Sequence, residues 1–169
     1  MKKIYYTFLV AISVVILSMC SKTSSVEEEK FEEALLENEK AVINPSEMET
    51  EVLGLINDYR VSIGASKLQS NSTSYQYAEE HNNYMIAQKK LSHDNFQSRA
   101  SKIALETGAV DVGENVARYY TTAQLVFDGW IESASHKEAI EGGYTHTTLS
   151  ITLDKDGRPY FTQIFMKVE

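Results

Sequence analysis

The 169-residue chain contains one cysteine, two prolines and one tryptophan, and it has no long apolar run. Its single cysteine, Cys20, cannot form a disulfide within the chain, so packing must stabilise any folded domain. The uncharged run from Ile4 to Leu17 has 14 residues, fewer than the ~20 that a membrane-spanning helix needs. Acidic residues outnumber basic ones by 24 to 16. Without a basic stripe, the sequence gives no electrostatic reason to expect nucleic-acid binding.

The first twenty residues have the pattern of a secretory signal. Lys2 and Lys3 give a basic start, the uncharged run follows, and Cys20 stands at its end. We therefore predict a lipoprotein signal peptide over residues 1–20, with Cys20 as the lipidated residue that anchors the chain to a membrane. Met19 replaces the small residue that usually precedes such a cysteine, so an ordinary signal peptide that leaves a free thiol is the alternative. Both interpretations export the chain to the cell envelope.

The segment that follows differs in composition from the rest of the chain. Residues 21–48 contain three lysines and eight glutamates. A segment this rich in charge has too little apolar surface to fold alone. We predict an acidic tether over residues 21–45 and one domain of common size over residues 46–169. We expect a monomer that binds no nucleic acid.

Helix signals dominate the first half of the predicted domain. Ser46 is expected to cap a first helix, with Glu49 completing a capping box and Gly64 ending the helix. Further helices are expected over about 71–90 and 97–106, and a fourth, capped by Thr121 or Thr122, is expected to carry Leu125, Val126 and Trp130. In the second of these four helices His81 falls on the apolar face, where the simplest interpretation is a hydrogen-bonded core histidine.

Strand signals appear in the middle and at the end of the domain. A strand is expected over 110–119. Apolar residues at 149, 151 and 153 alternate with Thr or Ser, which predicts a half-buried strand. A turn at 154–157 and a second strand over 158–167 would complete a hairpin. Helices covering a small antiparallel sheet indicate the α+β class.

Three dispersed segments carry the candidate chemistry: Leu-Ser-His-Asp-Asn-Phe at 91–96, Gly-Glu-Asn-Val-Ala at 113–117, and Trp-Ile-Glu-Ser-Ala-Ser-His at 130–136. In this order and at these separations they resemble the CAP superfamily of cysteine-rich secretory, antigen 5 and pathogenesis-related proteins, specifically its exported bacterial branch. The resemblance covers about residues 49–167. It implies a three-layer α-β-α sandwich with an open cleft that holds His and Glu side chains.

The resemblance nominates His93, Glu114 and His136 as one cleft site, with Gln163 on the cleft floor. Neutral imidazoles and a carboxylate can bind Zn²⁺ with water at the open position, or they can transfer protons without a metal. From the residues alone, both remain open, and so does a structural role in which these side chains only hydrogen-bond to their neighbours. Many eukaryotic members have a second cleft glutamate where this chain has Ser133, so the four-residue cluster is incomplete.

Three functions compete at this point. The first is a lipid-anchored extracytoplasmic binding domain whose polar cleft takes a ligand, a glycan or a protein at the bacterial envelope. The second is a divalent-metal-dependent hydrolase of peptides or envelope polymers that uses the same cleft, and the third is a purely structural envelope protein. No Ser-His-Asp or Cys-His nucleophile and no His-Glu-x-x-His signature can be found. The sequence therefore favours binding and leaves open whether the protein is an enzyme.

Overall fold

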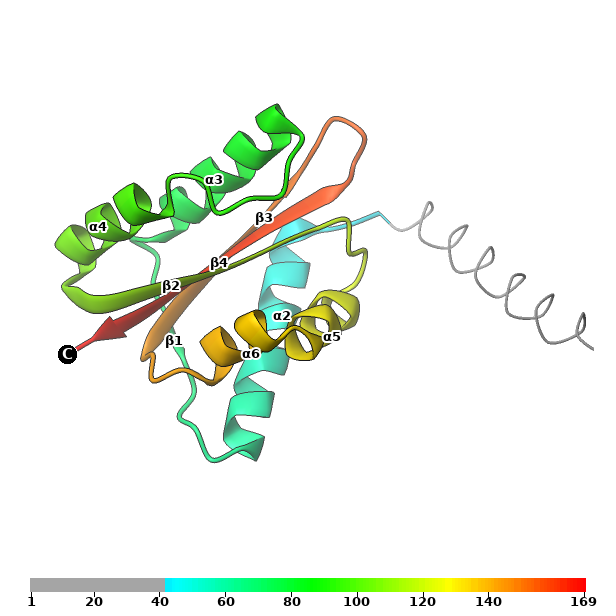
Figure 1. Ribbon diagram of the computed structural model, residues 1–169. Helices are drawn as coiled ribbons and strands as arrows, with labels where there is room; N and C mark the ends of the chain where they lie inside the picture. Colours follow the sequence, from blue (N-terminus) through cyan, green and yellow to red (C-terminus); the bar gives the residue numbers. More distant parts are fainter. Residues whose placement is uncertain (1–41) are drawn as a thin grey trace, which may run out of the picture. The chain divides into compact units, whose positions relative to one another are not determined.

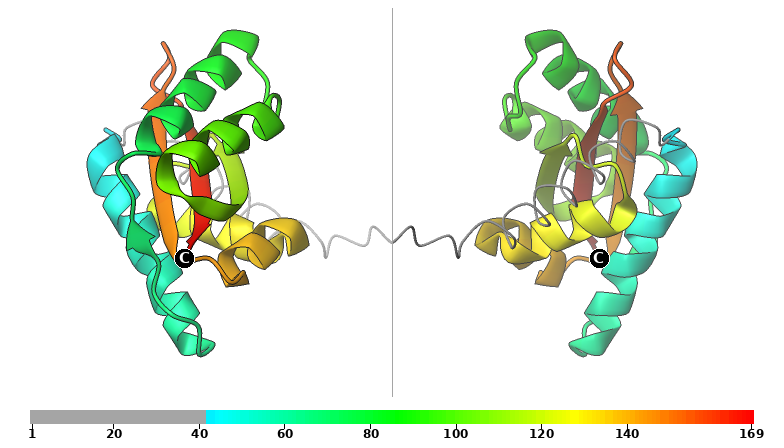
Figure 2. Two further views of the ribbon diagram at one scale, coloured as in Figure 1. Left: turned by 90° about the vertical axis from the view of Figure 1, so that its left-hand side faces the viewer. Right: turned by 90° about the vertical axis from the view of Figure 1, so that its right-hand side faces the viewer.

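The computed structural model describes residues 42–169, so the predicted signal peptide and nearly all of the predicted tether lie outside the described residues. A four-stranded sheet with the order β1-β3-β4-β2 lies between two layers of helices (Figure 1). Helices α3 and α4 cover one face, and α2, α5 and α6 cover the other (Figure 2). This arrangement confirms the α+β class and the three-layer sandwich.

The predicted elements are present, with shifts of a few residues at their ends. The hairpin strands, the middle strand and all the expected helices are found. One strand was missed: β1 has only two polar residues and pairs in parallel with β3, so the sheet is mixed rather than purely antiparallel. The elements are α2 (Pro45–Ser62), β1 (Gln69–Ser70), α3 (Tyr75–Gln88), α4 (Phe96–Thr107), β2 (Ala109–Arg118), α5 (Ala123–Glu132), α6 (Ala134–Glu141), β3 (His146–Leu153) and β4 (Pro159–Val168).

The start of α2 differs from the prediction. Asn44, not Ser46, is the N-cap, and its side chain accepts a hydrogen bond from the Glu47 main-chain N–H at 3.4 Å. Pro45 occupies the first helical position, where its fixed φ suits a helix and its missing N–H costs nothing. The helix therefore begins one residue before the expected domain boundary.

Glu49 does not complete a capping box either. Its carboxylate reaches across to the sheet, where it accepts hydrogen bonds from the Ile151 N–H at 2.8 Å and the Tyr75 hydroxyl at 3.0 Å. β1 is too short to pair with this part of β3. Glu49 thus takes the place of a neighbouring strand for one main-chain donor.

Strand β3 is buried on both faces, so the half-buried prediction is wrong. Ser150 is as inaccessible as Leu149, because helices cover both sides of the sheet. The polar groups on the α3 side meet Asn82, whose amide donates to the Ser150 carbonyl at 2.8 Å and accepts from the Thr162 hydroxyl at 2.7 Å. Asn82 therefore satisfies a main-chain carbonyl of β3 and a hydroxyl of β4, while the Ser150 hydroxyl has no partner among the described residues.

The largest cluster of apolar side chains lies between the sheet and α2, α5 and α6. Trp130 of α5 belongs to this cluster and is 1% exposed. Its indole N–H donates to the Val116 carbonyl of β2 at 3.4 Å. On the same side, the buried guanidinium of Arg60 donates to the Ile140 carbonyl at 2.5 Å and holds the end of α6 against α2. Within residues 42–169 no helix combines the length and apolarity of a membrane span.

Candidate functional site

The candidate site is built around a buried carboxylate in the middle of β2. Glu114 points toward the α3–α4 side of the sheet, and its side chain is 1% exposed. Arg99 of α4 binds both of its oxygens, with Nε donating to Oε2 at 2.8 Å and Nη2 to Oε1 at 2.9 Å. This two-bond geometry is the strongest arrangement available to an arginine and a carboxylate. Arg99 thereby neutralises the buried negative charge of Glu114.

His93 completes the part of the site that faces solvent. It lies in the loop between α3 and α4, and its Nδ1 is 2.9 Å from Glu114 Oε1. Half of its side chain is exposed, at 51%. Since a carboxylate accepts, Nδ1 carries the proton of this bond, and Nε2 is the nitrogen left for a ligand. Two of the residues nominated by the resemblance are thus in contact, and their role as a cleft site stays a prediction.

His81 supports this loop from beneath. Its Nε2 donates to the Ser92 carbonyl at 2.7 Å and lies 3.8 Å from Glu114 Oε1. Its ring stacks on Tyr84, whose hydroxyl donates to Asp94 at 3.1 Å. Burial lowers the pKa of His81, which keeps the imidazole neutral. His81 is the hydrogen-bonded core histidine expected from the sequence, and it also fixes the backbone beside His93.

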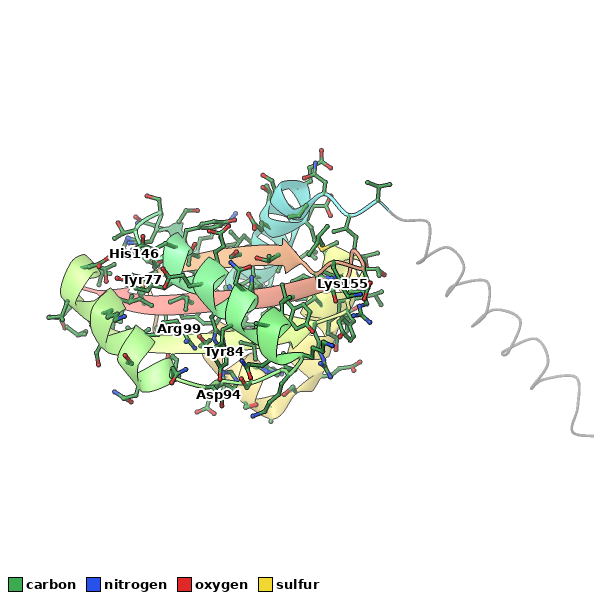
Figure 3. All side chains as sticks on the ribbon, turned by 90° about the horizontal axis from the view of Figure 1, so that it is seen from above. Tyr77, Tyr84, Asp94, Arg99, His146 and Lys155 are labelled. Atoms are coloured by element: carbon green, nitrogen blue, oxygen red, sulfur yellow. The ribbon has the colours of Figure 1, made fainter. Side chains whose placement is uncertain are left out.

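Side chains from α3, α4 and their loop gather on the same side of the sheet, where Figure 3 labels Tyr84, Asp94 and Arg99. Beside Arg99 is a hollow of about 180 Å³ between the two helices, also lined by His81 and Tyr84. His93 and Glu114 do not line this hollow, which meets the site through Arg99 and His81.

His136 comes from the opposite layer. It lies on α6, and the buried Asn115 amide of β2 donates to its main-chain carbonyl at 3.1 Å. Burial and then the charge of His93 lower the pKa of His136. Its Nδ1 is buried without a hydrogen-bond partner among residues 42–169. His136 is thus close enough to His93 for the charge of His93 to lower its pKa. No contact among the described residues joins the His136 ring to Glu114.

Gln163 is completely buried in β4, in register with Asn115. Its amide donates to the Thr147 hydroxyl at 3.1 Å, and its Oε1 has no partner among the described residues. It lies inside the sheet layer on the α5–α6 side, away from Glu114. Its expected place on the floor of an open cleft stays a prediction.

The predicted zinc set does not fit this arrangement. Nowhere in residues 42–169 are three His, Cys, Asp or Glu side chains placed to hold a metal ion. Both oxygens of Glu114 already accept from Arg99, so a metal would have to compete with a buried guanidinium. Zinc binding by His93, Glu114 and His136 stays a prediction, and no chemical step is derived from it.

Sequence reasoning missed Arg99, although one signal was present. Arg99 shares the buried face of α4 with Ala100 and Ile103, and an arginine on an apolar face needs a buried partner. Gly113, by contrast, has a steric reason to precede Glu114. A Cβ at this position would lie 2.6 Å from the Tyr144 hydroxyl, so only glycine allows this approach.

Comparisons with known proteins agree with the observed fold. The family model described as CAP, the cysteine-rich secretory protein family, matches residues 53–165. The uncharacterized membrane protein YlbC of Bacillus subtilis is 31% identical over 150 residues, which cover 86% of this chain and 39% of that protein. The chain therefore spans about two fifths of the length of this curated relative.

Solved structures share the fold. An outer surface protein of Borrelia burgdorferi has a TM-score of 0.67 at 20% identity, covering 75% of this chain and 97% of that one. A cysteine-rich secretory protein of Staphylococcus aureus has a TM-score of 0.63 at 16% identity, covering 75% and 40%. An extracellular protein of Bacillus anthracis that contains an SCP domain has a TM-score of 0.61 at 20% identity, covering 73% and 41%.

Proposed function

The chain belongs to the cysteine-rich secretory protein (CAP) family, and on this premise we propose that it is an exported, lipid-anchored binding domain of the bacterial cell envelope. Its cleft would take a polar ligand, glycan or protein at His93. The observation that carries the proposal is the half-exposed imidazole held by a carboxylate that Arg99 neutralises. Glu114, Arg99 and His81, which lie behind the exposed imidazole, are all hydrogen-bonded, and these bonds hold His93 in place.

Export and anchoring draw support from the sequence and from relatives. The basic start, apolar run and Cys20 form a lipoprotein-type signal. YlbC is described as a membrane protein, and two of the structural relatives are described as an outer surface protein and an extracellular protein. Replacing Cys20 with serine should release the chain from the membrane fraction. A variant that still sediments with membranes after detergent-free washing would refute the anchor.

The contacts of Glu114 favour binding over hydrolysis. A general base needs a free lone pair directed at its substrate, whereas Arg99 and His93 engage both Glu114 oxygens. His93 Nε2 remains available, as an acceptor when neutral and a donor when protonated. These groups suit hydroxyl and amide groups of a ligand. A neutral His93 Nε2, with Nδ1 held by Glu114, could also accept a proton, so the hydrolase stays the alternative to binding.

The binding proposal is tested with the released Cys20→Ser chain and isolated cell-envelope polymer. The chain with unchanged cleft residues should sediment with the polymer. His93→Ala should weaken this binding by about tenfold, the value of one lost hydrogen bond to a ligand. His146→Ala is the matched control, since His146 lies at the start of β3 and bonds to Thr145. Equal binding by His93→Ala and the control would refute a cleft centred on His93.

A further inference from the structure

The outer edge of β2, next to Glu114, presents main-chain groups instead of side chains. β2 is the last strand of the sheet and pairs only with β4. It runs between α4 on one side and α6 on the other (Figure 1). A strand in this position has a row of N–H and C=O groups that face away from the sheet.

The pairing pattern identifies which residues provide those groups. The Tyr119 N–H donates to the Pro159 carbonyl, which places Tyr119 on the side that faces β4. The Val116 carbonyl instead accepts from Trp130, outside the sheet. In an antiparallel pair the two directions alternate along the strand. The main-chain groups of Val112 and Glu114 therefore point outward.

Exposure supports this assignment. The Glu114 side chain is 1% exposed, yet the residue as a whole is partly exposed, so its accessible atoms belong to the main chain. Val112 and Gly113 are also partly exposed. Among residues 42–169, no main-chain hydrogen bond outside the sheet reaches Val112 or Glu114. The stretch of outward-facing main chain at Val112–Glu114, called the window below, is short. Trp130 occupies one end through its bond to the Val116 carbonyl, and an irregular register between Ala109 and Asp111 marks the other end.

Hollows of different chemistry flank this window. The one on the α6 side, about 300 Å³, is lined by the exposed carboxylates of Asp111 and Glu138 and by no cation. Neither carboxylate has an ion-pair partner among the described residues. The one on the α4 side, also about 300 Å³, is lined mainly by small and apolar side chains, such as Ala100 and Ala104, and it shares Asp111 with the first.

We propose that the edge of β2 at Val112–Glu114 binds an extended peptide segment in which cationic and small apolar side chains alternate. Successive side chains of a strand point to opposite faces. Cationic side chains would meet Asp111 and Glu138, and apolar ones would meet the α4 hollow. A second copy of this chain would bring the same carboxylates, so charge favours a different partner. This inference goes beyond the proposed function, because the strand pairing uses main-chain groups of β2 and not the imidazole of His93.

The probe is an acetylated, amidated Lys-Val-Lys-Val-Lys peptide, titrated into the full Cys20→Ser chain. Two analogues carry N-methyl groups on the main chain. The first is methylated at every lysine and the second at both valines, so each analogue lacks the N–H donors of one edge of the peptide. Charge is the same in all three. We expect the parent peptide to bind and one analogue to bind about tenfold more weakly, because main-chain hydrogen bonds supply the affinity in strand addition. Equal binding by all three, or no binding by the parent, overturns the proposal.

Protein variants test the same edge from the other side. Val112→Pro removes an outward N–H but no bond to β4, and it should reproduce the loss, while Val112→Ala should not. Asp111→Asn with Glu138→Gln should weaken the parent peptide about tenfold, and Glu132→Gln, an exposed carboxylate on α5, should have little effect. If the Asp111 and Glu138 changes have no effect, the charge assignment is wrong. His93→Ala decides the proposed function separately, since the strand pairing uses no imidazole.

Discussion

Replacing Arg99 with leucine tests how strongly the cleft depends on its buried ion pair. Glu114 is 1% exposed and Arg99 is 9% exposed, and two hydrogen bonds of 2.8 and 2.9 Å join them. Removing one partner of such a pair leaves an uncompensated buried charge, at a cost of about 3–5 kcal/mol. His93 offers Glu114 only one further bond. With a denaturant slope of ~1–3 kcal/mol per molar urea, the unfolding midpoint should fall by about 2 M.

The assay is urea unfolding followed by the fluorescence of Trp130, the only tryptophan of the chain. Lys102→Leu is the matched control: Lys102 lies exposed on the same helix, so its loss should change stability by no more than about 0.5 kcal/mol. The double variant Arg99→Leu with Glu114→Leu should recover most of the loss, because no charge remains buried. A single variant that costs under about 1 kcal/mol, or a double variant as unstable as the sum of the two, would refute the reasoning.

Three further perturbations test other parts of the fold. Trp130→Ala should cost about 3–5 kcal/mol, measured by circular dichroism, and a loss below about 1 kcal/mol would contradict its central place in the core. Burial raises the pKa of Glu49 above its ordinary value of 4.5, so folding favours the protonated carboxyl. The stability it adds is present below the ordinary value and is lost as pH rises through the raised one. Glu49→Gln should flatten this dependence above the ordinary pKa of 4.5, and an unchanged profile would assign the dependence to another group. Gly113→Ala should cost about 1–3 kcal/mol, because its Cβ would meet the Tyr144 hydroxyl, and unchanged thermal unfolding would show that Tyr144 moves freely aside.

Local signals predicted the elements whose ends are set by local chemistry. Helix α4 was placed within one residue at each end, because Gly108 ends it with a φ of +72°. The threonine cap before α5 and the glycine turn before β4 were found for similar reasons. The start of α2 was misplaced because Asn44 and Ser46 are both competent caps, and the choice depends on the proline between them.

Longer-range features could not be read from the sequence. The burial of Ser150 depends on which helices cover each face of the sheet, and its alternation with apolar residues looks the same in a half-exposed strand. Arg99 and Glu114 lie in different elements, and no local pattern joins them. The family resemblance nominated His93 and Glu114 from separate motifs, and these two side chains are in contact. It did not indicate that Arg99 binds the carboxylate expected to hold a metal.

The order of the strands has a consequence for when the candidate site can form. Among residues 42–169, β4 (Pro159–Val168) is the strand that joins β3 to β2. Without it, β2 has no neighbour in the described sheet, and Glu114 has no fixed position relative to the other strands. Contacts between residues far apart in the chain are slow to form. The site around Glu114 is therefore complete only after β4 has docked, although Arg99 and Glu114 both precede β4 in the chain.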